Sequence, residues 1–342
     1  MPSSTVLNLT DPHQYQSAVR GADLQVFITA RGTFSAKLTR IDLHHVWMQR
    51  GHLSLPAVTR SAMRPQRSSI VFLADADQSP MLNNGNEVSP GDIVCYALQS
   101  EHHVRASGGY HCCAMSLTPD DLAAFGRALV GHELTAPPAT RALRPPPALM
   151  SRLQALHRSA SDLAATAPDI LAHPEVAKAR DQELIRAMVA CLANPETEER
   201  YGSCRPRIPV MLRFEQILDA KQDRPLYVAD ICAEMGVSDR TLRLHCQEQL
   251  GMSPHRYLWL RRMNLARRAL AIAAATEKTV TAIANDHGFG ELGRFAVAYR
   301  RLFGESPSVT LRRTPDDHRS ANTRGTVGEC WPDGKRRASR IF

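Results

Sequence analysis

Two stretches in the C-terminal third of this 342-residue chain repeat one pattern. They read VADICAEMGVSDRTLRLHCQEQLGMSP (residues 228–254) and VTAIANDHGFGELGRFAVAYRRLFGESP (residues 280–307). Their beginnings align at an offset of 52 residues and their ends at 53, so one residue is inserted between them. Because a solenoid needs roughly three or more repeats to bury a core, two copies indicate a pair of compact helical modules.

Each copy has the pattern of two helices joined by a tight turn. In the first copy, Val228, Ile231 and Cys232 follow the i, i+3, i+4 spacing of a buried helix face. Gly236 stands where this helix must end and turn, and Ser238 is a typical N-cap for a second helix. The second copy has the same plan, with Gly288, Phe289, Phe295, Tyr299 and Phe303 in the equivalent places.

The positive charge of the chain is concentrated around these copies. The whole chain has 42 basic and 34 acidic residues, a formal charge of +8. Residues 1–204 have a net charge of −1, residues 205–313 have +7, and residues 314–342 have +2. This asymmetry predicts a polyanion-binding domain beside a near-neutral domain. Charge alone is also compatible with a solvated basic face.

The second helix of the first copy has a polar outward face. Arg240, Arg243 and Gln247 lie at i, i+3 and i+7 and therefore project together, as an element in the DNA major groove requires. A helix predicted over residues 253–273 is about 30 Å long, close to the ~34 Å of one duplex turn. It can hold two helix-turn-helix units in successive major grooves. We expect its arginines to face phosphate or solvent: Arg261, Arg262, Arg267 and Arg268.

Residues 210–313 resemble the AraC/XylS family of bacterial transcription regulators. The resemblance rests on the first copy with the helix that follows it and, most strongly, on the second copy. The second copy contains Gly-Phe (residues 288–289), Arg-Phe (294–295), Tyr-Arg-x-x-Phe-Gly (299–304) and Ser-Pro (306–307). The resemblance covers about a third of the chain.

The resemblance implies two recognition helices, at residues 238–249 and 290–303. In the first, the DNA-binding residues would be Ser238, Arg240, Thr241, Arg243, Leu244 and Gln247. In the second, they would be Glu291, Gly293, Arg294, Ala296, Val297 and Arg300. Because several residues of the second set have no side-chain donor, we expect the first helix to supply most of the sequence specificity.

The N-terminal half has a different pattern. Residues 24–117 contain short β-branched and aromatic runs separated by turn residues, which predicts a sandwich or small barrel. Residues 118–194 are predicted to be helical, 195–209 to be a linker, and 314–342 to be disordered. The resemblance implies that residues 1–194 form a cupin-like β-barrel sensor with flanking helices used for dimerisation. The predicted fold is therefore a two-domain α+β chain with an all-α C-terminal domain.

Four residues of the N-terminal half are candidates for an effector pocket: Trp47, Phe72, Tyr96 and His103. Core packing is the alternative interpretation of the same residues. Histidines at 102, 103 and 111 and the adjacent Cys112 and Cys113 raise the question of a metal or redox site. Their spacing does not match the His-x-His pattern of cupins, so we expect no metal, cofactor or catalytic site.

The resulting hypothesis is a sequence-specific regulator, usually an activator in this family, that binds double-stranded DNA and responds to a small-molecule effector. The family resemblance adds RNA polymerase and a second copy of the chain as expected partners. A barrel enzyme, or a redox or metal sensor, fused to a DNA-binding module is the alternative. The sequence has no secretory signal and no apolar run of membrane-spanning length, which favours a cytoplasmic protein.

Overall fold

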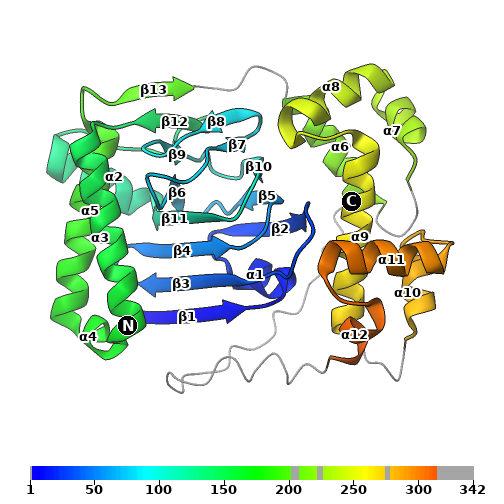
Figure 1. Cartoon of the computed structure of the whole chain (residues 1–342). Helices are drawn as coiled ribbons and strands as arrows, with labels where there is room; N and C mark the ends of the chain where they lie inside the picture. The colour runs from blue at the N-terminus through cyan, green and yellow to red at the C-terminus, as the bar shows by residue number, and fades with distance from the viewer. Residues whose placement is uncertain (1, 202–207, 222–225, 274–277, 314–342) are drawn as a thin grey trace, which may run out of the picture.

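The computed structural model describes residues 2–201, 208–221, 226–273 and 278–313, leaving out the side chains of 208 and 209. Figure 1 shows three parts side by side: a stack of helices, two β-sheets, and a second group of helices on the opposite side of the sheets. The predicted two-domain α+β architecture is confirmed. The predicted disordered tail, residues 314–342, lies outside the described residues.

The strands form two antiparallel sheets. The first has eight strands in the order β1 (Ser3–Leu9), β3 (Ala36–Asp42), β4 (Trp47–Leu53), β11 (Tyr110–Leu117), β6 (Ser68–Leu73), β9 (Ile93–Cys95), β12 (Arg141–Arg144) and β13 (Glu198–Tyr201). The second has five strands in the order β2 (Ala22–Ile28), β5 (Ala57–Met63), β10 (Glu101–Ala106), β7 (Met81–Asn83) and β8 (Asn86–Val88). In the described residues the strands form two open sheets rather than one closed barrel.

The helices lie on both sides of this pair of sheets (Figure 1). The N-terminal domain contains α1 (Pro12–Ala18), α2 (Pro119–Val130), α3 (Pro147–Thr166), α4 (Pro168–Ala172) and α5 (Pro174–Ala193). Each begins with proline, whose fixed φ and missing N–H suit the first helical position. The C-terminal domain contains α6 (Ile208–Ala220), α7 (Val228–Met235), α8 (Asp239–Leu250), α9 (Pro254–Ile272), α10 (Val280–Asp286), α11 (Leu292–Phe303) and α12 (Pro307–Arg312).

Three details of the N-terminal half differ from the sequence prediction. Strand β1 and helix α1 precede residues 24–117, the range predicted to contain the strands, and β13 lies inside the predicted linker. Within the stretch predicted to form strands, residues 43–46 form none, and β4 begins at Trp47. The buried Asp181 of α5 explains this, because its carboxylate accepts hydrogen bonds from the backbone N–H of His45 (3.0 Å) and Val46 (2.9 Å). A contact between residues so far apart has no local signal.

The five-stranded sheet is buried on both faces. On β2, Val26 and Ile28 pack into the core between the two sheets, whereas Phe27 packs against the C-terminal helices. On β5, Ala57 and Val58 divide in the same way. Because successive side chains of a strand point to opposite faces, neighbouring apolar residues of these strands contribute to two different cores. The C-terminal domain is therefore attached to the sheet by continuous apolar packing.

A buried carboxylate lies at the centre of this attachment. Glu215 of α6 is fully buried, and its Oε1 accepts a hydrogen bond from Tyr257 Oη (2.7 Å) and lies 2.9 Å from His103 Nε2. Arg261 donates to Glu215 Oε2 (3.1 Å), and Arg60 lies 3.6 Å from the same oxygen. His103 and Arg60 are directly paired on β10 and β5. The sheet and the helices thus share one ion cluster.

The cluster is balanced by further carboxylates at its edge. Asp219 accepts hydrogen bonds from Arg261 (2.6 Å) and Arg60 (2.5 Å), and Glu101 accepts one from Arg60 (2.7 Å). Burial by itself raises the pKa of Glu215. The hydrogen bond from His103 and the charges of Arg261 and Arg60 outweigh it and lower that pKa to about 2. Glu215 is therefore ionised at neutral pH.

This arrangement corrects the expectation for two arginines of α9. Arg261 and Arg267 are only 4% and 6% exposed. Arg261 belongs to the Glu215 cluster, and Arg267 pairs with Asp11 of the N-terminal domain (3.2 Å) and with Glu305 (3.3 Å). They hold the domains together rather than facing DNA. The sequence shows which face of a helix they occupy but not what packs against it.

We expect Glu215→Gln to lower the free energy of unfolding by roughly 3–5 kcal/mol at neutral pH, because it removes the fully buried anion that Arg261 faces and leaves only the carboxylates at the edge of the cluster. Since the folded-state pKa is depressed, the contribution is complete above the ordinary pKa of 4.5 and is lost as the pH falls towards about 2. Denaturant unfolding across this range measures the difference. The matched control is Glu183→Gln, on the surface of α5. Equal stability of Glu215→Gln and wild type at neutral pH would contradict the expectation.

Candidate nucleic-acid interface

Local signals in the first repeat produce a helix-turn-helix. Helix α7 ends at Gly236, which has the left-handed φ of 66° that glycine adopts without strain. The hydroxyl of Ser238 then accepts a hydrogen bond from Thr241 N (3.1 Å) and begins α8. Leu242 and Cys246 of α8 are fully buried against α7 and α9. This packing fixes which face of α8 is left outside.

The outer face of α8 carries the residues predicted from the sequence. Arg240, Arg243, Leu244 and Gln247 are exposed, and Leu244 is 57% exposed despite its apolar side chain. Arg243 pairs with Asp239 one turn earlier at 2.8 Å, an exposed contact that costs little to exchange for a base. The hydroxyls of Ser238 and Thr241 lie 2.8 Å apart at the N-cap. Those two residues shape the start of the helix.

Helix α11 presents a less polar face. Phe295, Tyr299 and Phe303 form its buried side, while Glu291, Gly293, Arg294, Val297 and Arg300 are exposed and Ala296 is half-buried. Arg294 pairs with Glu291 at 3.0 Å. Sequence reasoning missed the exposed Arg301 and Leu292 on this helix. The spacing of Arg301 four residues after Val297 would have identified it.

Helix α9 connects the two units. It has 19 residues, which corresponds to about 28 Å, and it packs against α8 at one end and α10 and α12 at the other. This is slightly shorter than the ~34 Å of a duplex turn. The length remains compatible with two recognition helices on one side of DNA.

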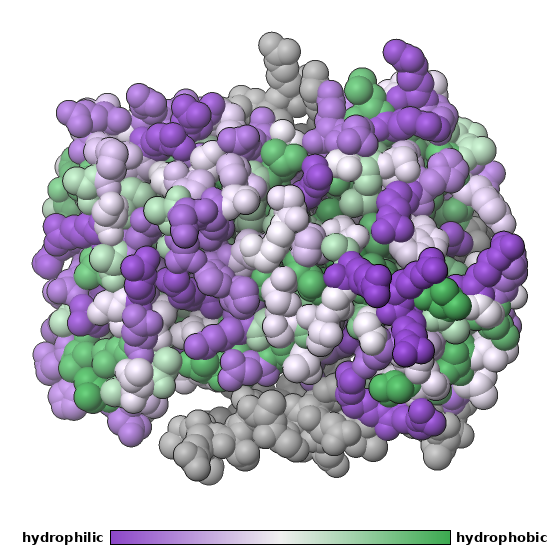
Figure 2. Space-filling model, in the orientation of Figure 1, coloured by the Kyte–Doolittle hydropathy of each residue, from purple (hydrophilic) through white to green (hydrophobic). Residues whose placement is uncertain are grey.

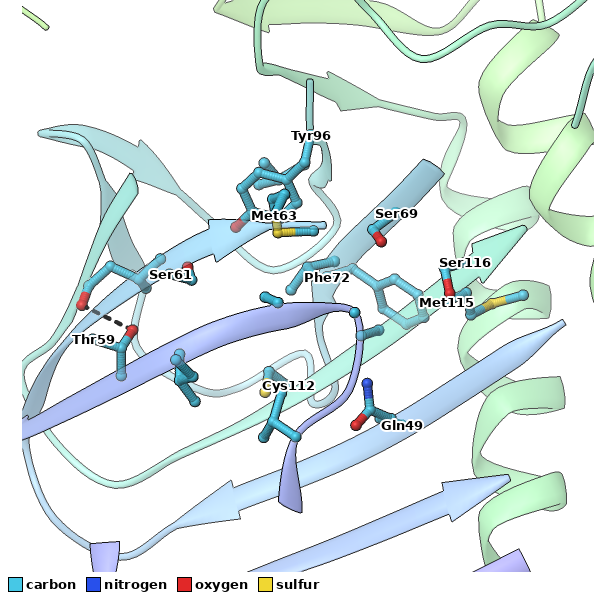
Figure 3. A pocket seen from close by; sticks show the side chains of 18 of the residues that line it. Gln49, Thr59, Ser61, Met63, Ser69, Phe72, Tyr96, Cys112, Met115 and Ser116 are labelled. Carbon is cyan, nitrogen blue, oxygen red and sulfur yellow. Dashed lines mark hydrogen bonds between the residues drawn. The ribbon is translucent and has the colours of Figure 1, made fainter. Parts of the chain in front are cut away.

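The N-terminal domain contains a cavity of about 140 Å³ between its sheets. Figure 3 shows Phe72, Tyr96, Met63 and Cys112 around it, with Gln49 and Ser116 at its edge. Trp47 also lines it, so the structure brings together three of the four predicted pocket residues. His103 lies elsewhere: it follows His102 on β10 and points to the opposite face, towards Glu215.

The cavity is mostly apolar with a small polar group. Asn83 is 3% exposed and donates through its amide nitrogen to Tyr96 Oη (3.1 Å), while its Oδ1 has no hydrogen-bond partner among the described residues. The ring of His102 stacks on Tyr96 at 4.2 Å, and burial lowers the pKa of His102 to about 3, so it is neutral. Arg20 is the one charged residue among the described lining, and it already pairs with Asp42.

Two alternative chemistries receive no support from the described residues. Burial raises the pKa of the Cys112 thiol to about 11, which opposes the thiolate that a redox sensor needs. No group of three or more potential metal ligands occurs in the part of the chain that the structure describes. Within the same residues, no helix is long and apolar enough to cross a membrane.

Comparison with known proteins agrees with the C-terminal geometry. Residues 231–313 match a family model described as a helix-turn-helix domain. The chain is 36% identical over 150 residues to a probable thc operon regulatory protein of Rhodococcus erythropolis, covering 43% of this chain and 45% of that protein. It is 33% identical over 105 residues to the XylDLEGF operon transcriptional activator of Pseudomonas putida, covering 31% and 33%.

Among solved structures, a probable AraC family transcriptional regulator from Rhodopseudomonas palustris is 36% identical, with 30% of this chain and 94% of that chain covered and a TM-score of 0.27. The chain spans less than half the length of the two curated relatives, and the match to the family model lies within the C-terminal repeats. By this helix-turn-helix domain, the chain belongs to the AraC/XylS family of bacterial transcription regulators.

Proposed function

We propose that this protein is a sequence-specific, DNA-binding transcription regulator whose activity depends on a small molecule bound in the N-terminal domain. The proposal rests on the exposed outer faces of α8 and α11, which belong to two units connected by α9. The basic charge of residues 205–313 supports it. In this proposal the N-terminal domain extends to β13 and the C-terminal domain begins with α6. The proposal also places the protein in the cytoplasm, where chromosomal DNA lies.

In this proposal, α8 supplies most of the base recognition. The guanidinium groups of Arg240 and Arg243 can each donate two hydrogen bonds, to O6 and N7 of a guanine in the major groove. Leu244 is exposed beside them and offers an apolar contact for a thymine methyl. On α11, Val297 and Gly293 have no donors, so this helix reads shape and methyl groups. Gln247 and Arg300 lie nearer the DNA backbone.

The proposed effector is a neutral molecule about the size of one six-membered ring. A dry protein cavity of about 150 Å³ holds benzene, and the cavity here is about 140 Å³. Asn83 Oδ1 provides an acceptor for one hydroxyl or amine of the ligand, because a buried polar atom without a partner is costly. With Arg20 paired to Asp42, the described lining of the cavity offers no unpaired cation for a ligand carboxylate.

The direction of regulation and the protein partners in this proposal are taken from the family. We propose activation, contact with RNA polymerase, and a homodimer formed through the N-terminal domain. The proposal includes no enzymatic role, and a metal-dependent one would lack a group of three or more potential ligands among the described residues. The named relatives include a transcriptional activator, which favours activation over repression.

Arg240→Ala and Arg243→Ala should each weaken binding to duplex DNA from upstream of the protein's own gene by roughly 1–3 kcal/mol, because each removes a base contact. Binding to a scrambled duplex should change far less. Fluorescence anisotropy with both duplexes measures the difference, and Arg152→Ala on the exposed side of α3 is the control. An equal loss on both duplexes would assign these arginines to phosphates instead.

Ala114→Leu should abolish binding in the N-terminal cavity, because Ala114 lines it and the added carbons occupy the ligand's space. Benzyl alcohol and benzoate form a matched neutral and charged pair of probes. Benzyl alcohol at 100 times its Kd should stabilise the wild type by about 2.7 kcal/mol in a thermal-shift experiment, and benzoate should not. Ala124→Leu, exposed on α2, is the control. Stabilisation by benzoate alone would contradict the proposed class of effector.

A further inference from the structure

A second groove lies where the N-terminal domain meets α9 and α11. It has a volume of about 600 Å³ and is lined from the N-terminal side by the loop between β2 and β3, and from the other side by the two helices. Four arginines line it, Arg31, Arg256, Arg294 and Arg301, and no carboxylate does. Figure 2 shows strongly hydrophilic side chains gathered over the region of α11 in this view. Such a lining suits a polyanion.

The loop that carries Arg31 is hydrogen-bonded to α9 at its base and lies close to the end of α11 further along. At its base, Ile28 N donates to Asn264 Oδ1 of α9 (3.3 Å). Further along, Gly32 O approaches the C-cap of α11, where a Cβ added to Gly304 would lie 3.5 Å from it. Gly304 ends α11 with a left-handed φ of 78°, a conformation that glycine adopts without strain. Arg31 therefore projects from an anchored segment beside the reading face of α11.

The charges in the groove are available to a ligand. Arg31 and Arg301 are exposed and form no ion pair with any described residue. Arg256 lies over the ring of Trp259 at 4.5 Å, which orients it without neutralising it. Only Arg294 has an acidic partner, the exposed Glu291. Since exposed pairs of this kind are weak, the groove keeps a strong positive potential.

We propose that this groove holds the sugar-phosphate backbone beside the major groove that α11 reads, and that Arg31 of the N-terminal domain donates to a phosphate there. The inference rests on the proposed function and adds a DNA contact from outside the helix-turn-helix domain. The groove adjoins Gly293 and Val297, the reading residues without donors. The affinity of α11 for its part of the DNA site must then come from contacts with the sugar-phosphate backbone.

The test measures duplex binding by the full-length chain over a salt series. Arg31→Ala should bind roughly tenfold more weakly than wild type at about 50 mM salt. Raising the salt to about 200 mM weakens binding by both proteins, and the factor should be about 3.5 times smaller for Arg31→Ala because one phosphate contact is gone. The loss should be equal for the upstream and scrambled duplexes. Arg31→Lys should restore the salt slope. Arg127→Ala, which removes a cation on α2 across the N-terminal domain from the C-terminal helices, is the control (Figure 1).

Unchanged or tighter binding by Arg31→Ala, with wild-type binding intact, would overturn this inference and leave the proposed function standing. Absence of duplex binding by the wild type would overturn both. A third outcome identifies a small-anion site: the salt slope stays at the wild-type value, while sodium phosphate at constant ionic strength competes with DNA less effectively for Arg31→Ala. That result would also overturn the inference, because it places a free anion in the groove.

Discussion

The position of the helix-turn-helix units relative to the sheets depends on one buried carboxylate, Glu215. Its hydrogen-bond and ion-pair partners come from both domains: His103 and Arg60 from the sheet, Tyr257 and Arg261 from α9. Buried ion pairs contribute little net stability compared with apolar packing, but they fit only one geometry. Phe27 and Val58 supply the apolar area around the cluster. The cluster therefore selects one orientation of α6 and α9 on a surface that packing alone would leave less specific.

The C-terminal domain was predictable because its signals are local. Glycine at the end of α7 and the serine N-cap of α8 favour a turn there, and the second copy repeats the left-handed glycine at Gly288, although the N-cap of α11, Glu291, makes no side-chain cap. The exposed faces of α8 and α11 then follow from helical periodicity. The same periodicity failed for Arg261 and Arg267. It located them correctly on α9 but carried no information that a carboxylate from another element would lie opposite each one.

The N-terminal domain was less predictable because the five-stranded sheet is covered on both faces. A sheet with one wet face shows alternation between polar and apolar residues, whereas β2 and β5 show almost none. For this reason the sequence could not separate His103, which faces the helices, from His102, which stacks on Tyr96. The bend before β4 was equally hidden, because it depends on Asp181 more than a hundred residues away.

The same double burial gives the fold a short physical connection between its two sites. Thr59 and Ser61 of β5 line the cavity of the N-terminal domain, and Arg60 between them belongs to the Glu215 cluster. On β10, Val104 lines the cavity and His103 contacts Glu215. A ligand that displaces either strand thus acts on residues bonded directly to those that hold α6 and α9. Opposite faces of β5 and β10 therefore contact the cavity and the Glu215 cluster, and one peptide unit separates the residues that do so.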